Sequence, residues 1–182
     1  VVVRTPFGDV VPEADAHFTN EKHLALAIRT ADCVPVLIHD PDSGFIAAIH
    51  AGWRGVENEI IRKTGARLHT LGTNLKRAHA WIGPHIGLES FEVGEDVALK
   101  LEARLDAVRA HTEVATAIHA HPSPGKKRVD LLSIVRAQLG SIGIDRERII
   151  EHALDTVMSP DHESFRRDGE RATRQISFIA LN

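Results

Sequence analysis

Apolar residues run almost without interruption through three short stretches in the first third of the chain. The stretches cover residues 24–30, 34–39 and 45–50, and such unbroken runs are typical of strands that are covered on both faces. A turn-forming cluster, residues 40–44, separates the second stretch from the third. The pattern therefore predicts an antiparallel hairpin and, with it, a sheet that is mixed rather than purely parallel.

Farther along the chain the spacing of apolar residues changes to about 3.6 and predicts helices. The predicted helices cover residues 56–71, 93–109 and 130–139, and Asp130 can cap the start of the last one. Short strands are predicted at residues 78–82, from Ile149 onward, and at 175–181, whereas the polar residues 159–173 predict an exposed loop. The fold class predicted is α+β: a mixed β-sheet packed with helices, in a single layered α/β sandwich domain.

The length of 182 residues fits one domain with a substantial core. A net charge of −3 argues against nucleic-acid binding, because it offers no excess of cations for phosphates. No apolar run approaches the roughly 18 residues of a membrane span, and the first residues lack the pattern of a signal peptide. The single cysteine indicates a reducing compartment, the cytoplasm.

The chain begins with Val1-Val2-Val3-Arg4 rather than with Met. An apolar, β-branched run at the first residue resembles the middle of a strand. We therefore expect residues upstream of Val1 that are missing from this sequence.

Candidate chemistry concentrates where the first two predicted strands meet and where the third ends. Cys33 comes just before the second strand and His50 ends the third, so the hairpin places both at the same end of the sheet although 17 residues separate them. A thiolate and an imidazole could form an activated nucleophile or part of a zinc site. A buried cysteine that only packs is the third interpretation.

Residues around this pair could bind an anion or orient the histidine. Arg54 offers a planar guanidinium suited to phosphate, and Asp32 could orient a histidine or cap a turn. His85, between glycines after a predicted strand, occupies a plausible pocket position, whereas His119 and His121 are expected in a solvent-exposed loop. The run 165–168 is either a solvated face or a clamp for an anion, with one arginine turned inward.

Two motifs carry a resemblance to a known family. Residues 30–36, Thr-Ala-Asp-Cys-Val-Pro-Val, and 50–55, His-Ala-Gly-Trp-Arg-Gly, resemble the signature of the polyphenol oxidase or laccase-domain (YfiH-like) family. Four further segments are similar to other family motifs and extend the resemblance over the whole chain: residues 13–16, 82–84 with 91–94, 129–131 and 164–168.

The resemblance implies a purine nucleoside phosphorylase that binds one zinc ion through a histidine, a cysteine and a second histidine. The cysteine corresponds to Cys33 and the second histidine to His50, whereas the first belongs to a Gln-Val-His-Gly motif expected a few residues upstream of Val1. The chain departs from the family pattern at several places. His85 and Asp155 stand where the family usually has cysteines, the tyrosine of the Phe-Ser-Tyr-Arg-Arg element is missing, and the Thr-Gly-Arg element appears only as residues 172–174.

The activity implied is phosphate-dependent cleavage of adenosine, inosine and methylthioadenosine, with adenosine deamination as a side activity. Small-molecule nucleoside and phosphate are the expected partners, and a homodimer is an expected assembly. Arg54, Arg166 and Arg167 are the candidates for holding phosphate. Trp53 and Phe165 are the candidates for stacking on the base, and Asp32 and His85 for further substrate contacts.

Three alternatives stay open at this point. A metal-free hydrolase would use Cys33 as nucleophile and His50 as base. A copper-dependent polyphenol oxidase is the older family label, although one Cys–His pair supplies few ligands for several coppers. A metal-carrying or partner-binding domain without turnover is the third.

Overall fold

The computed structural model describes residues 13–182, apart from positions 112, 115 and 153. The strand suggested by Val1-Val2-Val3-Arg4 lies outside the described residues. The strands are β1 (Ala16–Thr19), β2 (Ala25–Thr30), β3 (Val34–His39), β4 (Ile46–Ala51), β5 (His79–Ile82), β6 (Glu92–Gly94), β7 (Ile118–Ala120), β8 (Lys126–Val129), β9 (Ile149–Glu151) and β10 (Gln175–Ala180). The α-helices are α1 (Trp53–Glu57), α2 (Ile60–Thr70), α3 (Glu95–Ala107), α4 (Leu131–Ser141) and α5 (Phe165–Asp168). Short 3₁₀ turns are η1 (Leu75–Arg77), η2 (Arg109–His111), η3 (Arg146–Arg148) and η4 (Gly169–Arg171).

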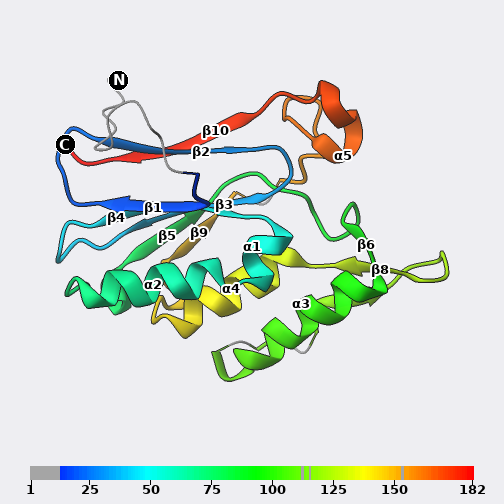
Figure 1. Cartoon of the computed structure of the whole chain (residues 1–182), viewed down its shortest axis with the longest axis horizontal. Coiled ribbons are helices and arrows are strands. Elements are labelled where there is room, and N and C mark those ends of the chain that lie inside the picture. The colour runs from blue at the N-terminus through cyan, green and yellow to red at the C-terminus, as the bar shows by residue number, and fades with distance from the viewer. Residues whose placement is uncertain (1–12, 112, 115, 153) are drawn as a thin grey trace.

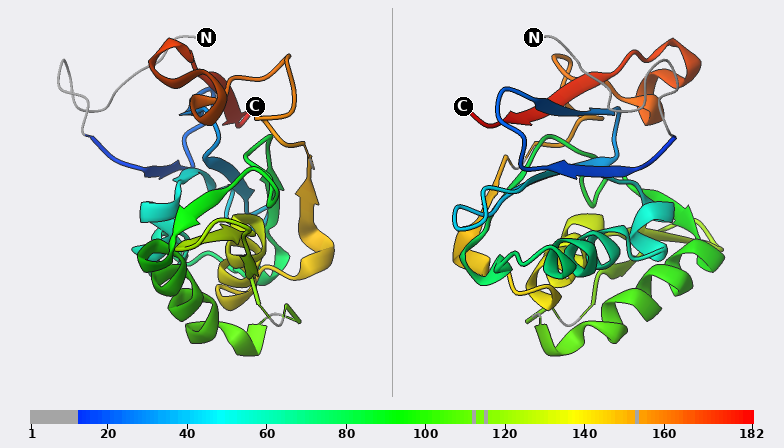
Figure 2. Two further views of the ribbon diagram at one scale, coloured as in Figure 1. Left: turned by 90° about the vertical axis from the view of Figure 1, so that its right-hand side faces the viewer. Right: turned by 60° about the vertical axis from the view of Figure 1, so that its left-hand side comes forward.

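The elements form layers, which Figures 1 and 2 show from three directions. A five-stranded sheet of order β1-β4-β3-β5-β9 lies in the middle. The antiparallel pair β2 and β10 covers one face of this sheet, and the helices α2 and α4 cover the other. At one end of the molecule, β6, β8 and β7 form a small third sheet beside α3.

The hairpin predicted around residues 40–44 is confirmed. Strands β3 and β4 pair antiparallel, with Pro35 opposite His50. Asp40 closes the turn, since its carboxylate accepts hydrogen bonds from the hydroxyl of Ser43 at 2.6 Å and from a backbone N–H two residues on. Gly44 has φ +72°, a conformation that favours glycine. The turn thereby fixes the register that brings the end of β4 back beside the start of β3.

The fold class is confirmed as α+β with a mixed sheet, because β5 pairs with β9 in parallel while the other pairs of that sheet are antiparallel. The expectation of strands around one sheet is wrong in detail, since the described strands divide among three sheets. Strand β2 is not part of the central sheet and pairs instead with β10, the last strand in the sequence. Pairing between segments this far apart in sequence leaves no local pattern to detect.

The predicted helix over residues 56–71 is interrupted, which corrects the periodicity-based prediction. The chain forms α1 and α2 with a break between them, where Glu59 takes a left-handed conformation with φ 57°. Apolar residues keep a helical spacing across the break because both helices pack on the same core, which explains why the pattern concealed it. The helix predicted over residues 93–109 begins only at Glu95, since Val93 belongs to β6.

The helix predicted after Asp130 is confirmed. The Asp130 carboxylate caps α4 by accepting a hydrogen bond from the Ser133 N–H at 3.0 Å. In the same helix the buried Gln138 donates to the Val56 carbonyl at 2.9 Å and so fixes α4 to α1. Strand β4 is buried along nearly its whole length, as its continuous apolar run predicts.

Two segments predicted as loops contain regular structure. The stretch 159–173 includes α5 and η4, and the Ser164 side chain caps α5 by accepting from the Arg167 N–H. His119 lies in β7 and is exposed, as expected, whereas only 14% of the His121 side chain is exposed, and its Nε2 lies 3.3 Å from Glu92 Oε2. Both segments are polar in sequence and are ordered by contacts to distant residues, which local composition does not report.

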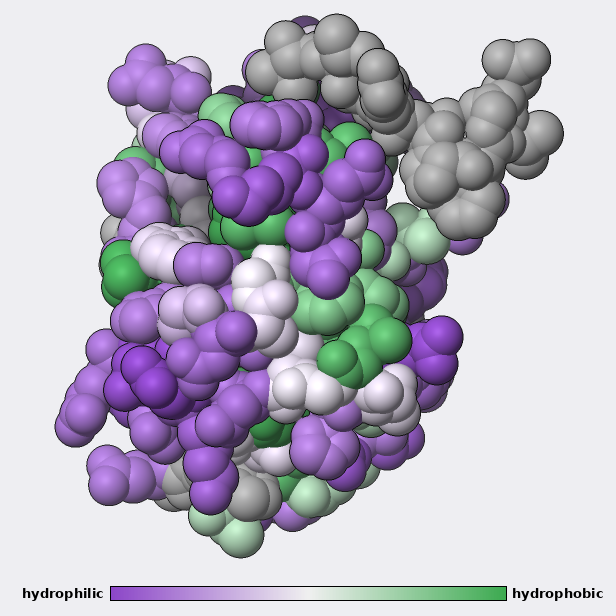
Figure 3. Space-filling view, turned by 90° about the vertical axis from the view of Figure 1, so that its left-hand side faces the viewer, coloured by the Kyte–Doolittle hydropathy of each residue, from purple (hydrophilic) through white to green (hydrophobic). Residues whose placement is uncertain are grey.

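The face of the molecule in Figure 3 is mostly polar. On the face in Figure 3, hydrophilic side chains predominate and hydrophobic ones lie in small separate groups. Among the described residues, no helix is both long and apolar enough to cross a bilayer.

Candidate functional site

A cleft of about 620 Å³ is lined by residues of α5, β6 and β8. Figure 1 shows these three elements at one end of the molecule. The loop between β2 and β3, the junction of β4 and α1, and the segment before β10 complete its lining. Seven of the sequence-predicted site residues line this one cleft: Asp32, Cys33, His50, Trp53, Arg54, Phe165 and Arg166. The hairpin register brings the first three together, and α5 supplies the last two.

Cys33 and His50 lie together in the lining of the cleft. The imidazole of His50 hydrogen-bonds the Cys33 side chain. Gly52 borders both groups, since a Cβ built on it would lie 2.9 Å from Cys33 Sγ and 3.7 Å from His50 Nε2. Glycine at this position therefore leaves the space that the sulfur and nitrogen share.

The other ring nitrogen of His50 contacts a carboxylate. His50 Nδ1 lies 2.8 Å from Asp15 Oδ1, a residue that immediately precedes β1. The hydrogen bond to Cys33 and the nearby Asp15 carboxylate raise the pKa of His50 to about 9, against the opposing effect of burial. Asp15 thus orients the ring so that Nε2 faces Cys33, the arrangement in which metal-binding histidines are commonly held.

Asp32 links the cysteine loop to the C-terminal part of the chain. Its backbone has φ +83°, and only 8% of the residue is exposed. One carboxylate oxygen accepts the Thr156 hydroxyl at 2.7 Å, and the other accepts the backbone N–H of Arg166 at 2.6 Å. Asp32 therefore fixes the start of α5 over the cleft and does not orient a histidine.

Arginines and aromatic rings form the rim of the cleft. The Arg54 guanidinium lies 4.4 Å from the centroid of the Trp53 ring, and that of Arg174 lies 5.9 Å from the Phe165 ring. Arg166 donates to the Ser90 and Glu92 carbonyls at 3.3 and 3.0 Å. This rim offers positive charge and flat apolar surfaces in one opening, which suits an anionic group together with an aromatic ring.

Two sequence-predicted residues lie outside the cleft lining. The guanidinium of Arg167 donates to the backbone carbonyls of Thr156, Ser159 and His162 at 2.8 to 3.0 Å and so fixes the C-terminal loop. His85 is 4% exposed, and its Nδ1 lies 2.8 Å from the Gly83 carbonyl. The structure gives both residues contacts that stabilise the loops behind the site.

Sequence reasoning missed several residues of the site. The sequence alone assigned no role to Asp15, because its contact with His50 depends on the pairing of β1 with β4. Arg29, Glu92 and Lys126 also line the cleft. Glu92 lies in segment 91–94 of the family resemblance but was assigned no role, and the pairing of β6 with β8 brings it close to Lys126.

The donor chemistry of the site fits a metal ion in part. A thiolate and an imidazole whose second nitrogen contacts a carboxylate are typical zinc ligands. Within the described part of the chain, no group of three histidine, cysteine, aspartate or glutamate side chains is placed to hold a metal. Cys33 and His50 could thus supply two ligands, and the third histidine expected upstream of Val1 stays a prediction.

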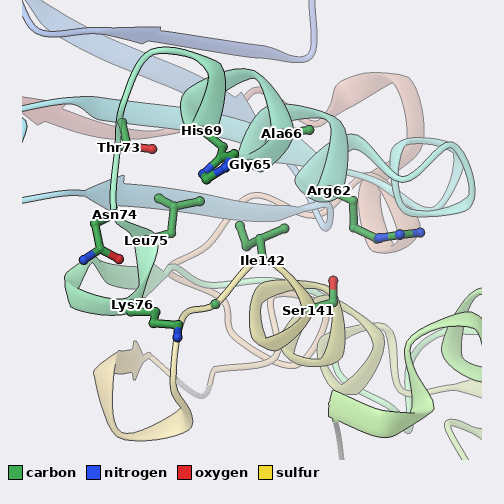
Figure 4. A pocket seen from close by; sticks show the side chains of 11 residues that line it. Arg62, Gly65, Ala66, His69, Thr73, Asn74, Leu75, Lys76, Ser141 and Ile142 are labelled. Carbon is green, nitrogen blue, oxygen red and sulfur yellow. The ribbon is translucent and has the colours of Figure 1, made fainter.

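A second hollow, of about 530 Å³, lies between α2, η1 and the end of α4 (Figure 4). Arg62, His69 and Lys76 lie around it, with Leu75 and Ile142 at its centre. It contains none of the sequence-predicted site residues and no cysteine. We therefore place the candidate active site in the cleft of Cys33 and His50.

The chain is similar to known proteins over most of its length. The sequence model of the family described as multi-copper polyphenol oxidoreductase laccase matches residues 1–182. A purine nucleoside phosphorylase of Corynebacterium glutamicum is 36% identical over 174 residues, which are 96% of this chain and 65% of that protein. An adenosine deaminase of an unknown prokaryotic organism is 31% identical over 137 residues, covering 75% of this chain and 50% of that protein.

Among solved structures, YlmD from Geobacillus stearothermophilus superimposes with a TM-score of 0.82 at 28% identity. The match covers 97% of this chain and 64% of that one. The chain thus spans less than two thirds of the length of each of these relatives.

Proposed function

Because the chain belongs to the multi-copper polyphenol oxidoreductase laccase family, whose relatives include proteins named purine nucleoside phosphorylase, we propose that it cleaves purine nucleosides with phosphate. The observation that carries the proposal is the Cys33–His50 pair in the lining of a cleft that also contains arginines and aromatic rings. Adenosine, inosine and methylthioadenosine are the proposed substrates. A location in the cytoplasm and a homodimeric assembly remain expectations.

Zinc is the proposed cofactor, with Cys33 and His50 as two of its ligands and Asp15 orienting His50. A zinc ion with an open coordination position acts as a Lewis acid and lowers the pKa of bound water. Copper is the alternative metal that the family description suggests. The donor pair of Cys33 and His50, one sulfur and one nitrogen, suits zinc.

The residues of the rim account for how the substrates would be held. In phosphorolysis a phosphate oxygen bonds to the ribose C1′ while the bond from C1′ to the purine nitrogen breaks and the purine takes a proton. Arg54 lies exposed at the cleft and could bind the phosphate, with Arg166 completing the cationic surface. Trp53 and Phe165 offer rings against which a purine could stack.

Adenosine deamination is proposed as a side activity, and the relative named adenosine deaminase supports it. In that reaction water adds to C6 of adenine and ammonia leaves. A metal-free hydrolase is the second candidate, because the interaction between Cys33 and His50 could also activate the thiol as a nucleophile. A metal-carrying domain without turnover would bind zinc and leave nucleosides intact.

Product analysis separates these candidates. Adenosine is incubated with the protein, with and without inorganic phosphate, before and after treatment with a chelator. Phosphorolysis gives adenine and ribose 1-phosphate only when phosphate is present, and chelation abolishes it. Adenine with free ribose, independent of phosphate and chelator, would indicate the cysteine hydrolase, and the absence of all turnover would contradict the proposal.

A further inference from the structure

Glu92 is a carboxylate of the cleft that has no role in the proposed chemistry of Cys33 and His50 or in phosphate binding. It lies in β6, where the neighbouring Val93 is buried in the core, so strand alternation turns Glu92 to the opposite side. Glu92 and Lys126 both line the cleft. Arg166 connects Glu92 to the catalytic pair, because Arg166 donates to the Glu92 carbonyl and to Asp32, the residue next to Cys33.

Two side chains hold the Glu92 carboxylate in place. Lys126 Nζ lies 3.0 Å from Oε1, and His121 Nε2 lies 3.3 Å from Oε2. The Ser123 N–H donates to His121 Nδ1 at 3.1 Å, so Nε2 is the nitrogen that carries a proton toward Glu92. The hydrogen bond from Lys126 also lowers the pKa of Glu92, which keeps the carboxylate ionised near neutral pH.

The held carboxylate keeps unused acceptor capacity. Each carboxylate oxygen can accept about two hydrogen bonds, and Lys126 and His121 take one on each. Asp32, the other carboxylate in the described lining, is buried and already accepts on both oxygens. Glu92 therefore presents two adjacent, ionised acceptors to the cleft, 37% of its side chain being exposed.

We propose that Glu92 accepts hydrogen bonds from the 2′- and 3′-hydroxyls of the substrate sugar, so that the site selects ribonucleosides over 2′-deoxyribonucleosides. This inference rests on the proposed function, because it takes the ligand of the cleft to be a nucleoside. The vicinal hydroxyls of ribose match two acceptors on one carboxylate, the same chemistry by which acidic residues recognise ribose in dinucleotide-binding folds. A site built around a hydroxyl discriminates against the analogue that lacks it, because the acceptor that the bound substrate covers is then left unpaired.

The test compares adenosine with 2′-deoxyadenosine in the protein and in its Glu92→Gln variant. We expect the unchanged protein to prefer adenosine, and Glu92→Gln to lower kcat/KM for adenosine by about 10- to 100-fold, the range for hydrogen bonds to a charged group. The value for 2′-deoxyadenosine, which keeps only the 3′-hydroxyl, should fall by a smaller factor, and the KM for phosphate should stay the same. An equal loss for both nucleosides, or an unchanged preference, would overturn the inference.

Glu89→Gln is the matched control, since Glu89 pairs with Arg128 at 2.9 Å, is 73% exposed and lies outside the cleft lining. Binding of the two nucleosides without phosphate, measured by calorimetry, separates this inference from the proposed function. Ribose-selective binding that depends on Glu92 but gives no turnover would support the inference and contradict the phosphorylase. Turnover without selectivity, or no binding of either nucleoside, would overturn the inference.

Discussion

Substitution of Gly52 by alanine probes the approach of Cys33 to His50 most sharply. The backbone at Gly52 has φ −70° and ψ 166°, which alanine adopts without strain. The added Cβ would lie 2.9 Å from Cys33 Sγ, whereas ordinary non-bonded contacts begin at about 3.5 Å. The sulfur must therefore move by roughly 0.6 Å or more, away from the space it shares with His50 Nε2.

A displacement of this size has a calculable consequence. Because misplacing a reacting group by about 1 Å costs on the order of 100-fold, we expect Gly52→Ala to lower kcat/KM for adenosine phosphorolysis by about 10- to 100-fold. That loss corresponds to about 1.4–2.7 kcal/mol of transition-state stabilisation. Bound zinc, measured by elemental analysis, should fall in parallel.

Gly44→Ala provides the control. Gly44 has φ +72° and open space around it, so alanine there strains only the hairpin turn. It should cost about 1 kcal/mol of unfolding free energy and leave kcat/KM unchanged. Wild-type activity and full zinc content in Gly52→Ala would refute the argument that the site requires the sulfur and the ring nitrogen at their present positions.

Three other predictions concern the residues that support the site and the core. Asp15→Asn removes the carboxylate that orients His50 and should lower zinc affinity about 10- to 100-fold in chelator competition; unchanged affinity would contradict the role. Asp32→Asn keeps a residue that tolerates positive φ but weakens two buried hydrogen bonds, so denaturant unfolding should show a loss of about 1–3 kcal/mol, and an unaltered midpoint would count against it. The hydrogen bond from Arg136 lowers the pKa of Glu151 below its ordinary value of 4.5, so this contribution to stability is complete above pH 4.5 and disappears as pH falls through the lowered pKa. Glu151→Gln should flatten that part of the stability–pH curve, and parallel curves for both proteins would show that the pair contributes nothing.

The sequence predicted the part of the site that depends on local structure. The turn at residues 40–44 and the apolar runs beside it predict the hairpin, and the hairpin alone places Cys33 near His50. The helix cap at Asp130 could likewise be predicted, because a capping side chain and the helix it starts are adjacent in sequence.

The parts that sequence reasoning missed depend on contacts between distant segments. Asp15 reaches His50 only because β1 pairs with β4, and Glu92 meets Lys126 only because β6 pairs with β8. Arg167, expected to hold phosphate, instead binds backbone carbonyls, and nothing in its local sequence distinguishes it from Arg166, which lines the cleft. Neighbouring residues of the same type point to different sides of α5, and only the packing of that helix decides which one faces the site.

The most direct test of the account measures ribose 1-phosphate and adenine formed from adenosine and inorganic phosphate, together with metal content. The protein is compared with its Cys33→Ala and His50→Ala variants. The account predicts equal amounts of both products from the unchanged protein, and the loss of both turnover and bound zinc in each variant. Continued formation of ribose 1-phosphate by the two variants would contradict the claim that the Cys33–His50 cleft is the active site.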